Sequence, residues 1–377
     1  MLKTMNRTPE KPEARPSVLE ILAYKPGGAS IEGKSEVIKL ASNESPLGPS
    51  PKAIKAVSAA LDHLELYPDG GAEALRGAIG EAHGLDPKLI ICGNGSEQLL
   101  SLLAQVYAGP GDQVIQSEFG FLIYRIATLA AGADLVVAKE TNFTTDVVAI
   151  LGAVSQRTRI VFLANPNNPT GTLIDAEELR QLRRQLPERV LLVIDAAYAE
   201  YVEDPAYIDG IDLVNESMAM GSDNVVALRT FSKIYGLAAL RLGWCYGPPG
   251  VIDALNRVRG AFNVSTLAQV AGIAAVGDRH HLASARRHNS EWLPRLTAGL
   301  RALGLEVLPS AGNFVLARFP GGADESVAAD RFLRDNGIIV RPVAGYGLPE
   351  ALRITIGSDE QNSALLEVMQ GFRSNFE

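Results

Sequence analysis

The chain has 377 residues, of which 47% are hydrophobic and 21% charged, the composition of an ordinary globular protein with room for one large and one smaller domain. Its net charge of −8 provides no basic surface for nucleic acid, and no run of 18 apolar residues offers a membrane-spanning helix. Two cysteines, Cys92 and Cys245, are too few for a disulfide framework or a metal cluster, so we expect a reducing compartment and no metal site.

The N-terminal segment is polar. Residues 1–17 contain three prolines and lack the apolar core of a secretion signal. We therefore expect a loose N-terminal arm, which we assign to residues 1–45, and a cytoplasmic protein that acts on small molecules.

The next part of the chain alternates between short apolar runs and amphipathic segments. The apolar runs predict seven strands, at Leu89–Cys92, Gln113–Gln116, Asp134–Ala138, Arg159–Leu163, Val190–Asp195, Val225–Leu228 and Arg241–Tyr246. Helical patterns lie between most of them, including Glu97–Tyr107, Phe121–Ala131, Ala176–Gln185 and Val251–Arg259. Such alternation is typical of a mostly parallel sheet covered by helices on both faces. The prediction is an α/β domain over residues 46–264.

The pattern changes after residue 265. A long helical stretch from Thr266 to about Leu303, interrupted at Pro294, comes first. Short strands and helices follow it, at Asn313–Arg318, Glu325–Arg334, Ile338–Arg341 and Leu352–Ile356, before a closing helix. This pattern predicts a smaller α+β domain over residues 265–377.

The residues that follow each strand decide the function, because ligands of open α/β sheets bind at the carboxyl ends of the strands. The loop Gly93–Gln98 opens a helix whose first amides would hold an anion. Glu118 stands at the spacing of a ribose-binding acid, but Gln98 stands where a dinucleotide fingerprint has its third glycine. This loop by itself suits a nicotinamide cofactor and a phosphate-anchored cofactor equally well, and simple helix capping is a third explanation.

Three further strand ends carry suggestive side chains. Phe119 could stack on a planar ring or pack in the core, and the Asn168 amide, in the turn-rich loop Asn165–Gly171, could donate to a ligand oxygen. Asp195 ends a central strand among apolar neighbours, where a carboxylate is costly unless it meets a cation or caps a turn.

Lys233 follows the strand Val225–Leu228 and precedes another buried run. Desolvation and nearby cations lower the pKa of a lysine and make its neutral amine available for a Schiff base. Ser232 and Arg241 add donors suited to a phosphate. An isolated Ser-Lys pair is usually only a surface turn, so this interpretation depends on the rest of the chain.

One ligand, pyridoxal 5'-phosphate (PLP), accounts for all of these residues. The pairings are its phosphate with Gly95, Ser96, Ser232 and Arg241, its ring with Phe119, its ring nitrogen with Asp195, its ring hydroxyl with Asn168 and Tyr198, and its carbonyl with Lys233. A nicotinamide dinucleotide explains the glycine loop but leaves the side chains of Lys233, Asp195 and Asn168 without a role.

The loop Asn165–Gly171, Asp195, Tyr198, Lys233 and Arg241 resemble, in this order, the fold-type I PLP-dependent aminotransferases. Within that group the chain resembles the histidinol-phosphate aminotransferase family over almost its whole length. The segments that carry this resemblance are Leu40–Ser50, Tyr67–Asp69, Gly93–Gln98, Arg229–Gly243, Phe262–Ser265, Arg341–Pro342 and Leu352–Gly357. Ser117–Phe119 departs from the family pattern, which has Pro-Thr-Tyr or Pro-Thr-Phe there, and Pro26–Gly28 lacks the Lys that often follows.

The resemblance implies a role for each matching residue. The roles in the cofactor site are the aldimine and proton transfer for Lys233, the pyridine nitrogen for Asp195, the phenolic oxygen for Tyr198 and Asn168, and the phosphate for Gly95, Ser96, Glu97, Thr230, Ser232 and Arg241. Tyr67 would reach the cofactor of a partner subunit, which implies a homodimer with shared active sites.

The resemblance also implies the substrates. Arg353 would bind the carboxylate of glutamate, Asn43 would contact the substrate, and Tyr24 and Arg341 would face the substrate phosphate. The implied reaction moves the amino group of histidinol phosphate to 2-oxoglutarate, in histidine biosynthesis. An aromatic amino acid aminotransferase and, less favoured, a PLP-dependent decarboxylase of the same fold remain as alternatives.

Overall fold

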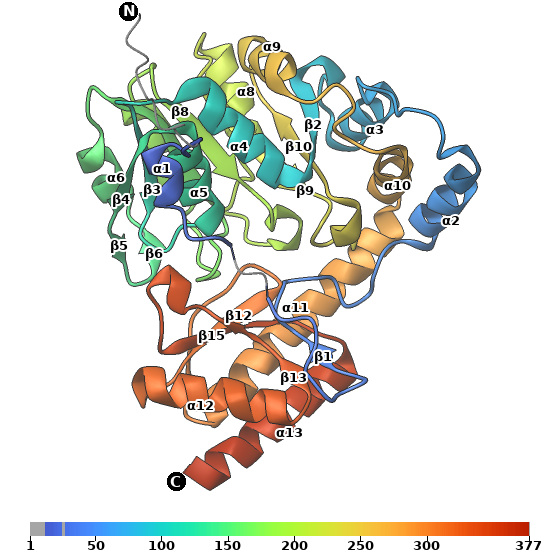
Figure 1. The fold of residues 1–377 in the computed structure, drawn as a ribbon, viewed down its shortest axis with the longest axis vertical. Helices are drawn as coiled ribbons and strands as arrows, with labels where there is room; N and C mark the ends of the chain where they lie inside the picture. The colour runs from blue at the N-terminus through green and yellow to red at the C-terminus, as the bar shows by residue number, and fades with distance from the viewer. Residues whose placement is uncertain (1–11, 25–26, 377) are drawn as a thin grey trace, which may run out of the picture.

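The structure is a computed structural model that describes residues 12–24 and 27–376. A large domain lies above a smaller one, and α11 (Arg279–Ala302) runs from one to the other (Figure 1). Residues 1–11, which begin the predicted arm, and Pro26 lie outside the described residues.

A seven-stranded sheet forms the centre of the large domain, in the order β2-β10-β9-β8-β7-β3-β4. The strands are β2 (Ile90–Asn94), β3 (Gln113–Ser117), β4 (Asp134–Ala138), β7 (Thr158–Ala164), β8 (Leu191–Asp195), β9 (Val225–Thr230) and β10 (Leu242–Tyr246). Only β10 runs antiparallel to its neighbours, and the other neighbouring strands pair in parallel. The predicted mostly parallel, seven-stranded sheet is therefore confirmed.

Helices cover both faces of this sheet because alternate strand residues point to opposite sides. In β9, for example, Val225 and Ala227 belong to one buried cluster, and Val226 and Leu228 to the other. The first face packs against α3 (Glu73–His83), α6 (Val147–Ala153), α7 (Ala176–Gln185), α8 (Ile211–Ala219) and α10 (Thr266–Val276). The second face packs against α4 (Gly95–Tyr107), α5 (Leu122–Ala131) and α9 (Pro249–Val258).

The helical stretch after residue 265 differs from its prediction. The break falls at Gly277 and Asp278, between α10 and α11, whereas α11 continues through Pro294. The Asp278 carboxylate accepts hydrogen bonds from Ser50 (2.5 Å) and Lys52 (3.3 Å), so a tertiary contact holds the chain at this bend. α10 packs against α2 (Pro51–Ala60) and α3. The predicted domain limits at residues 45 and 264 stay predictions.

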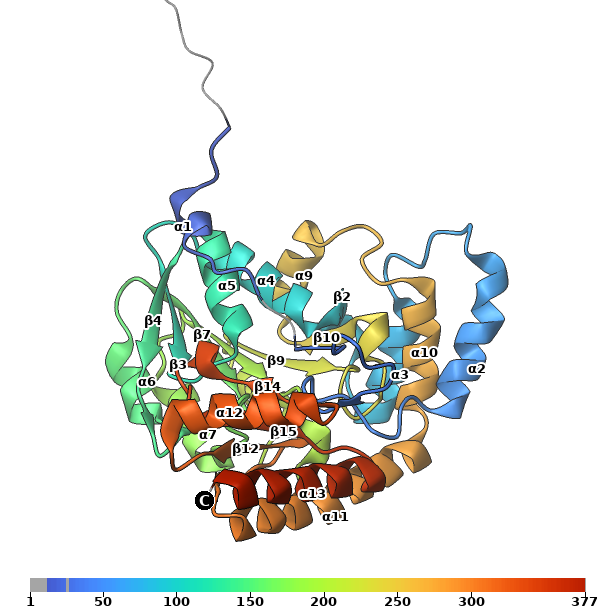
Figure 2. The ribbon, with the colours of Figure 1, turned by 60° about the horizontal axis from the view of Figure 1, so that its bottom comes forward.

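The smaller domain contains an antiparallel sheet in the order β11-β12-β15-β14, with β11 (Glu306–Val307), β12 (Phe314–Arg318), β14 (Arg341–Pro342) and β15 (Ala351–Thr355). It packs against α11, α12 (Gly322–Asp335) and α13 (Asp359–Phe376), and α11 and α13 lie side by side (Figure 2). The N-terminal segment joins this domain through β1 (Ile38–Lys39), which pairs in parallel with β13 (Ile338–Ile339).

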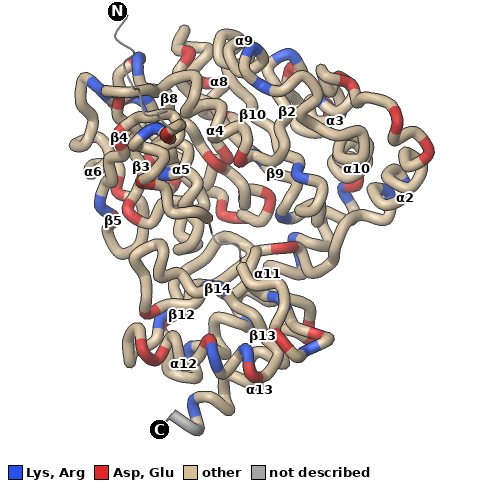
Figure 3. Tube along the Cα trace, in the orientation of Figure 1, with Lys and Arg blue, Asp and Glu red and all other residues tan. Residues whose placement is uncertain are grey.

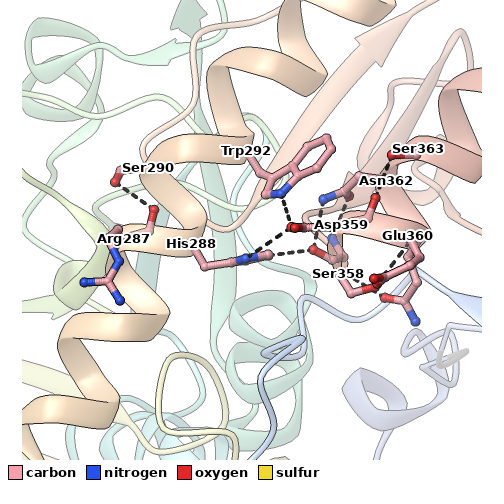
Figure 4. Close-up of polar contacts among 11 residues, drawn as sticks. Arg287, His288, Ser290, Trp292, Ser358, Asp359, Glu360, Asn362 and Ser363 are labelled. Atoms are coloured by element: carbon pink, nitrogen blue, oxygen red, sulfur yellow. Dashed lines mark hydrogen bonds and ion pairs between the residues drawn. The ribbon is translucent and has the colours of Figure 1, made fainter.

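A cluster of polar contacts ties α11 to the start of α13 (Figure 4). The ring of His288 meets the carbonyl of Gly357 at 2.8 Å, and the Trp292 indole donates to the Asp359 carboxylate at 2.5 Å. Because β15 leads directly into this cluster, the contacts hold the end of the strand that carries Arg353.

Charged residues of both signs are interspersed along both domains (Figure 3). Within the described residues, no helix combines the length and the apolar character needed to cross a membrane. The same part of the chain contains no group of three His, Cys, Asp or Glu side chains placed to hold a metal ion.

Candidate active site

A pocket lies where the carboxyl ends of β7, β8 and β9 meet the N-terminal segment and the small sheet. Most of the predicted site residues line it, namely Tyr24, Asn43, Ser96, Glu97, Asn168, Asp195, Tyr198, Thr230, Ser232, Lys233, Arg241, Arg341 and Arg353. These residues come from positions 24 to 353, so only the tertiary fold brings them together.

Lys233 extends into this pocket from the turn after β9. Its Nζ atom donates a hydrogen bond to the carbonyl of Ser42 at 3.0 Å and lies 5.7 Å from the centre of the Tyr198 ring. Burial of the amine lowers the pKa of Lys233 to about 7, and the positive charges of Arg353 and Arg241 act in the same direction. A substantial fraction of the amine is therefore neutral at physiological pH, as a nucleophile or base requires.

Asp195 ends β8 in the floor of the pocket. Its Oδ2 atom accepts a hydrogen bond from the Tyr124 hydroxyl at 2.9 Å, whereas Oδ1 is buried without a hydrogen-bond partner among the described residues. Burial raises the pKa of Asp195 to about 6, and the hydrogen bond from Tyr124, the nearby Ala197 amide and the charge of Lys233 oppose this shift. An orphaned carboxylate oxygen fits the protonated ring nitrogen of PLP, which would supply the missing donor and a positive charge.

Another part of the pocket contains donors that suit an anion. The helix α4 begins at Gly95, and its N-cap residue Asn94 makes no side-chain capping bond, so the first amides of α4 are open to a ligand. Arg241 Nη1 donates to Ser232 Oγ at 3.2 Å beside this helix end. Gly95 has a φ of 78°, and a Cβ atom there would lie only 2.6 Å from Arg241 Nη2. Glycine at this position therefore lets the guanidinium lie against the helix start, which suits a phosphate.

The two residues expected at the phenolic oxygen are both held by hydrogen bonds. Asn43 Nδ2 donates to the Tyr198 hydroxyl at 2.8 Å, so in this structure Asn43 orients Tyr198 directly. Asn168 Oδ1 accepts a hydrogen bond from Arg353 Nη1. Burial raises the pKa of Tyr198 to about 12, so its hydroxyl keeps its proton at neutral pH and can donate it to a ligand oxygen.

The small domain contributes two arginines to the same pocket. Arg341 in β14 lies directly opposite Arg353 in β15. Arg353 is 6% exposed and donates to the carbonyl of Ala41 at 2.8 Å, while its Nε has no hydrogen-bond partner among the described residues. The guanidinium carbon of Arg341 lies 5.6 Å from the centre of the Tyr24 ring. The pocket therefore contains a deep cation and a second, less buried cation beside an aromatic ring.

Comparisons with known proteins agree with this geometry. A family model described as aminotransferase class I and II matches residues 35–369. The histidinol-phosphate aminotransferases of Rhodopseudomonas palustris (strain BisB18) and Maricaulis maris (strain MCS10) are 50% and 51% identical to the chain over 364 and 361 residues, which is 96% of this chain and 98% of each relative. The chain belongs to the class I and II aminotransferase family.

Solved structures support the same assignment. The crystal structure of histidinol-phosphate aminotransferase from Sinorhizobium meliloti in complex with pyridoxal-5'-phosphate matches with a TM-score of 0.88 at 28% identity and covers 98% of this chain and all of that one. Aspartate aminotransferase from Thermus thermophilus with maleate, 24% identical and covering 89% of this chain and 92% of its own, shares the fold with a TM-score of 0.78. The enzyme is a PLP-dependent aminotransferase with the predicted fold-type I architecture.

The membership of an aminotransferase family also removes the nicotinamide alternative for the Gly93–Gln98 loop. Gln98 Oε1 accepts hydrogen bonds from the Asn94 amide at 2.8 Å and from Asn263 Nδ2 at 2.9 Å, so it secures the start of α4. Glu118, which stands at the spacing of a ribose-binding acid, pairs instead with Lys139. Both residues have structural partners that account for them.

Phe119 does not occupy its predicted place in this aminotransferase. It is absent from the pocket lining and stacks on Phe143 with a centroid distance of 5.6 Å. A tight turn, in which the Gly120 amide donates to the carbonyl of Ser117 at 3.0 Å, redirects the chain so that Phe121 lines the pocket. Phe121 is therefore the better candidate for the ring-stacking aromatic. Its position three residues before Tyr124, at the start of an amphipathic helix, is a signal that sequence reasoning could have used.

Tyr67 lies outside the pocket of its own chain. Its side chain is 81% exposed and stacks on Phe262 with a centroid distance of 4.6 Å. Exposed apolar side chains surround it in sequence, including Ile54, Leu61, Leu64 and Leu66. The single chain thus leaves Tyr67 available to another molecule.

Proposed function

We propose that this aminotransferase moves the amino group of histidinol phosphate to 2-oxoglutarate, which yields imidazole acetol phosphate and glutamate, in histidine biosynthesis. The observation that carries the proposal is the pair of opposed arginines, Arg341 and Arg353, in one pocket. Glutamate carries two carboxylates, whereas histidinol phosphate has no α-carboxylate and needs an anchor for its phosphate. Near-full-length relatives at 50% identity are named for this reaction, which adds support.

PLP, when bound, supplies the electron sink of the reaction and carries the amino group between the two substrates. The protein residues position it and move the protons. Arg241, Ser232, Thr230 and the amides of Gly95, Ser96 and Glu97 would bind the phosphate, and Tyr198 and Asn168 would contact the phenolic oxygen. Lys233 Nζ would remove the proton from the substrate Cα and return it, and Asp195 Oδ1 would hold the proton on the ring nitrogen.

Substitution of Arg341 tests the substrate assignment. Arg341→Ala should weaken the use of histidinol phosphate by roughly 2–5 kcal/mol, or about 30-fold or more in kcat/KM, because a substrate anion loses a partly desolvated cation. Turnover of phenylalanine should change far less, since its carboxylate would use Arg353. Steady-state kinetics with both amino donors measure the difference.

The control is Arg353→Ala, which should impair every substrate with a carboxylate. If the parent enzyme turned over phenylalanine or tyrosine efficiently and histidinol phosphate not at all, the aromatic aminotransferase would replace the proposal. Release of carbon dioxide from a substrate would favour the decarboxylase instead.

The proposed enzyme acts as a homodimer in which Tyr67 of each subunit reaches the cofactor phosphate of the other. Its exposed ring and the neighbouring exposed apolar side chains support such an interface. We also place the enzyme in the cytoplasm, because Cys92 and Cys245 are buried, unpaired thiols.

Mixed dimers test the shared site. We expect Tyr67→Phe to weaken cofactor binding by about tenfold, since one hydrogen bond to a charged phosphate is lost. Exchange of Tyr67→Phe subunits with inactive Lys233→Ala subunits should then produce one intact site in each heterodimer, and cofactor affinity at that site should equal the parental value. A mixture with confirmed subunit exchange but only weakened sites would contradict the crossing of Tyr67 between subunits.

A further inference from the structure

Tyr124 is a buried side chain that has no role in the mechanism proposed above. It lies in the first turn of α5, and its ring stacks on Phe162 of β7 at a centroid distance of 4.9 Å and an angle of 11°. The ring of Phe121, which lines the pocket, meets it edge-on at 5.9 Å. The Tyr124 ring is therefore held by packing on two sides, and its hydroxyl donates to Asp195 Oδ2 at 2.9 Å.

We propose that Tyr124 is the positioning residue for Asp195, which occupies Oδ2 so that Oδ1 is the oxygen presented to the ring nitrogen of the cofactor. The inference rests on the proposed role of Asp195. A carboxylate at a strand end can rotate about its terminal bond and exchange its two oxygens. A donor held by Phe162 and Phe121 on one side of the carboxylate selects a single orientation and leaves the other oxygen without a protein partner, as observed.

The electrostatics of the pair agree with this geometry. Burial raises the pKa of Tyr124 well above its ordinary value, and the neighbouring charge of Asp195 raises it further, so the hydroxyl keeps its proton and acts as a donor. Burial also raises the pKa of Asp195, whereas the hydrogen bond from Tyr124 lowers it. Tyr124 therefore favours the ionised carboxylate that a protonated ring nitrogen needs.

Cofactor binding by the full-length enzyme, freed of PLP, tests the inference without reference to turnover. The two probes are PLP and a PLP analogue with carbon in place of the ring nitrogen, which cannot pair with Asp195. Tyr124→Phe should reduce affinity for PLP by about tenfold, because the Asp195 carboxylate is no longer oriented for its charge-assisted hydrogen bond with the ring nitrogen. Affinity for the analogue should stay unchanged. The matched control is Tyr246→Phe, which removes a tyrosyl hydrogen bond to Asn215 Oδ1 (2.5 Å) away from the pocket and should change neither affinity.

Four results would overturn the inference. One is an affinity of Tyr124→Phe for PLP within about twofold of the parent value. Another is an equal loss of affinity for PLP and for the analogue, which would give Tyr124 only a packing role. If Tyr124→Phe does not fold, Phe162→Leu is the alternative variant, because it removes the ring that stacks on Tyr124. We expect it to reduce severalfold the preference of the enzyme for PLP over the analogue. An unchanged preference would count against a positioning role for Tyr124. Asp195→Asn distinguishes the role of Asp195 from the role of Tyr124. If Asp195→Asn leaves the preference for PLP over the analogue intact, the proposed role of Asp195 itself fails. If Asp195→Asn loses this preference but Tyr124→Phe keeps it, only the role of Tyr124 is rejected.

Discussion

Lys233→Ala should abolish transamination, with a fall in kcat of about four orders of magnitude or more, because the proposed roles of nucleophile for the cofactor and of proton carrier both belong to this one side chain. Burial and two neighbouring guanidinium groups lower the pKa of its Nζ amine to about 7. The proposed phosphate-binding groups at Gly95, Ser232 and Arg241 are untouched by this change. The variant should therefore still bind PLP, but without a covalent link.

Two measurements check this result. Borohydride reduction of the parent enzyme followed by peptide mapping should locate the cofactor on Lys233, and the variant should release all of its cofactor on denaturation. Lys139→Ala is the matched control, because Lys139 is an exposed lysine paired with Glu118 outside the pocket and should leave activity unchanged. A reduced adduct on any other lysine would refute the assignment of Lys233.

Asp195→Asn should lower kcat by about 100-fold or more, equivalent to ~3 kcal/mol in the barrier to proton removal. The change is nearly isosteric, but it removes the negative charge that would keep the ring nitrogen protonated. Asparagine can still accept the hydrogen bond from Tyr124, so the packing around β8 should be retained. Single-turnover kinetics with glutamate measure the proton-removal step directly.

The matched control for this experiment is Asp112→Asn, which breaks a surface ion pair with Arg159 (2.9 Å) outside the pocket. We expect it to leave the rate unchanged. A rate for Asp195→Asn within about threefold of the parent would mean that Asp195 only caps the end of its strand.

Local sequence patterns were enough to predict the large sheet. Apart from the edge strand β4, the strands of this sheet are mostly buried on both faces, so they appear as short, nearly continuous apolar runs. The helices between the strands carry their own 3.6-residue period. The weaker predictions were those that depend on contacts between distant segments. The helix break at Asp278 is one such case, since Ser50 and Lys52 stabilise it from more than 220 residues away.

The cofactor site was predictable for a related reason. Parallel strands place their carboxyl ends at one edge, so Asp195, Asn168 and Lys233, which follow different strands, had to lie near one another. The same rule did not predict which aromatic side chain lines the pocket. Phe119 and Phe121 are separated only by Gly120, and the turn at Ser117 decides which ring lines the pocket.

The sequence by itself thus determined the fold class, the order of the strands along the chain and most residues at the strand ends, because these follow from local periodicity and from a general rule of open sheets. The tertiary structure decided the hydrogen bonds that join the site, from Asn43 to Tyr198, from Arg353 to Asn168 and from Tyr124 to Asp195. These pairs are 155, 185 and 71 residues apart in the chain. Local pattern carries no information on such distant pairs, because their geometry depends on how distant segments pack together, within the large domain for Tyr124 and Asp195 and between the domains and the N-terminal segment for the others.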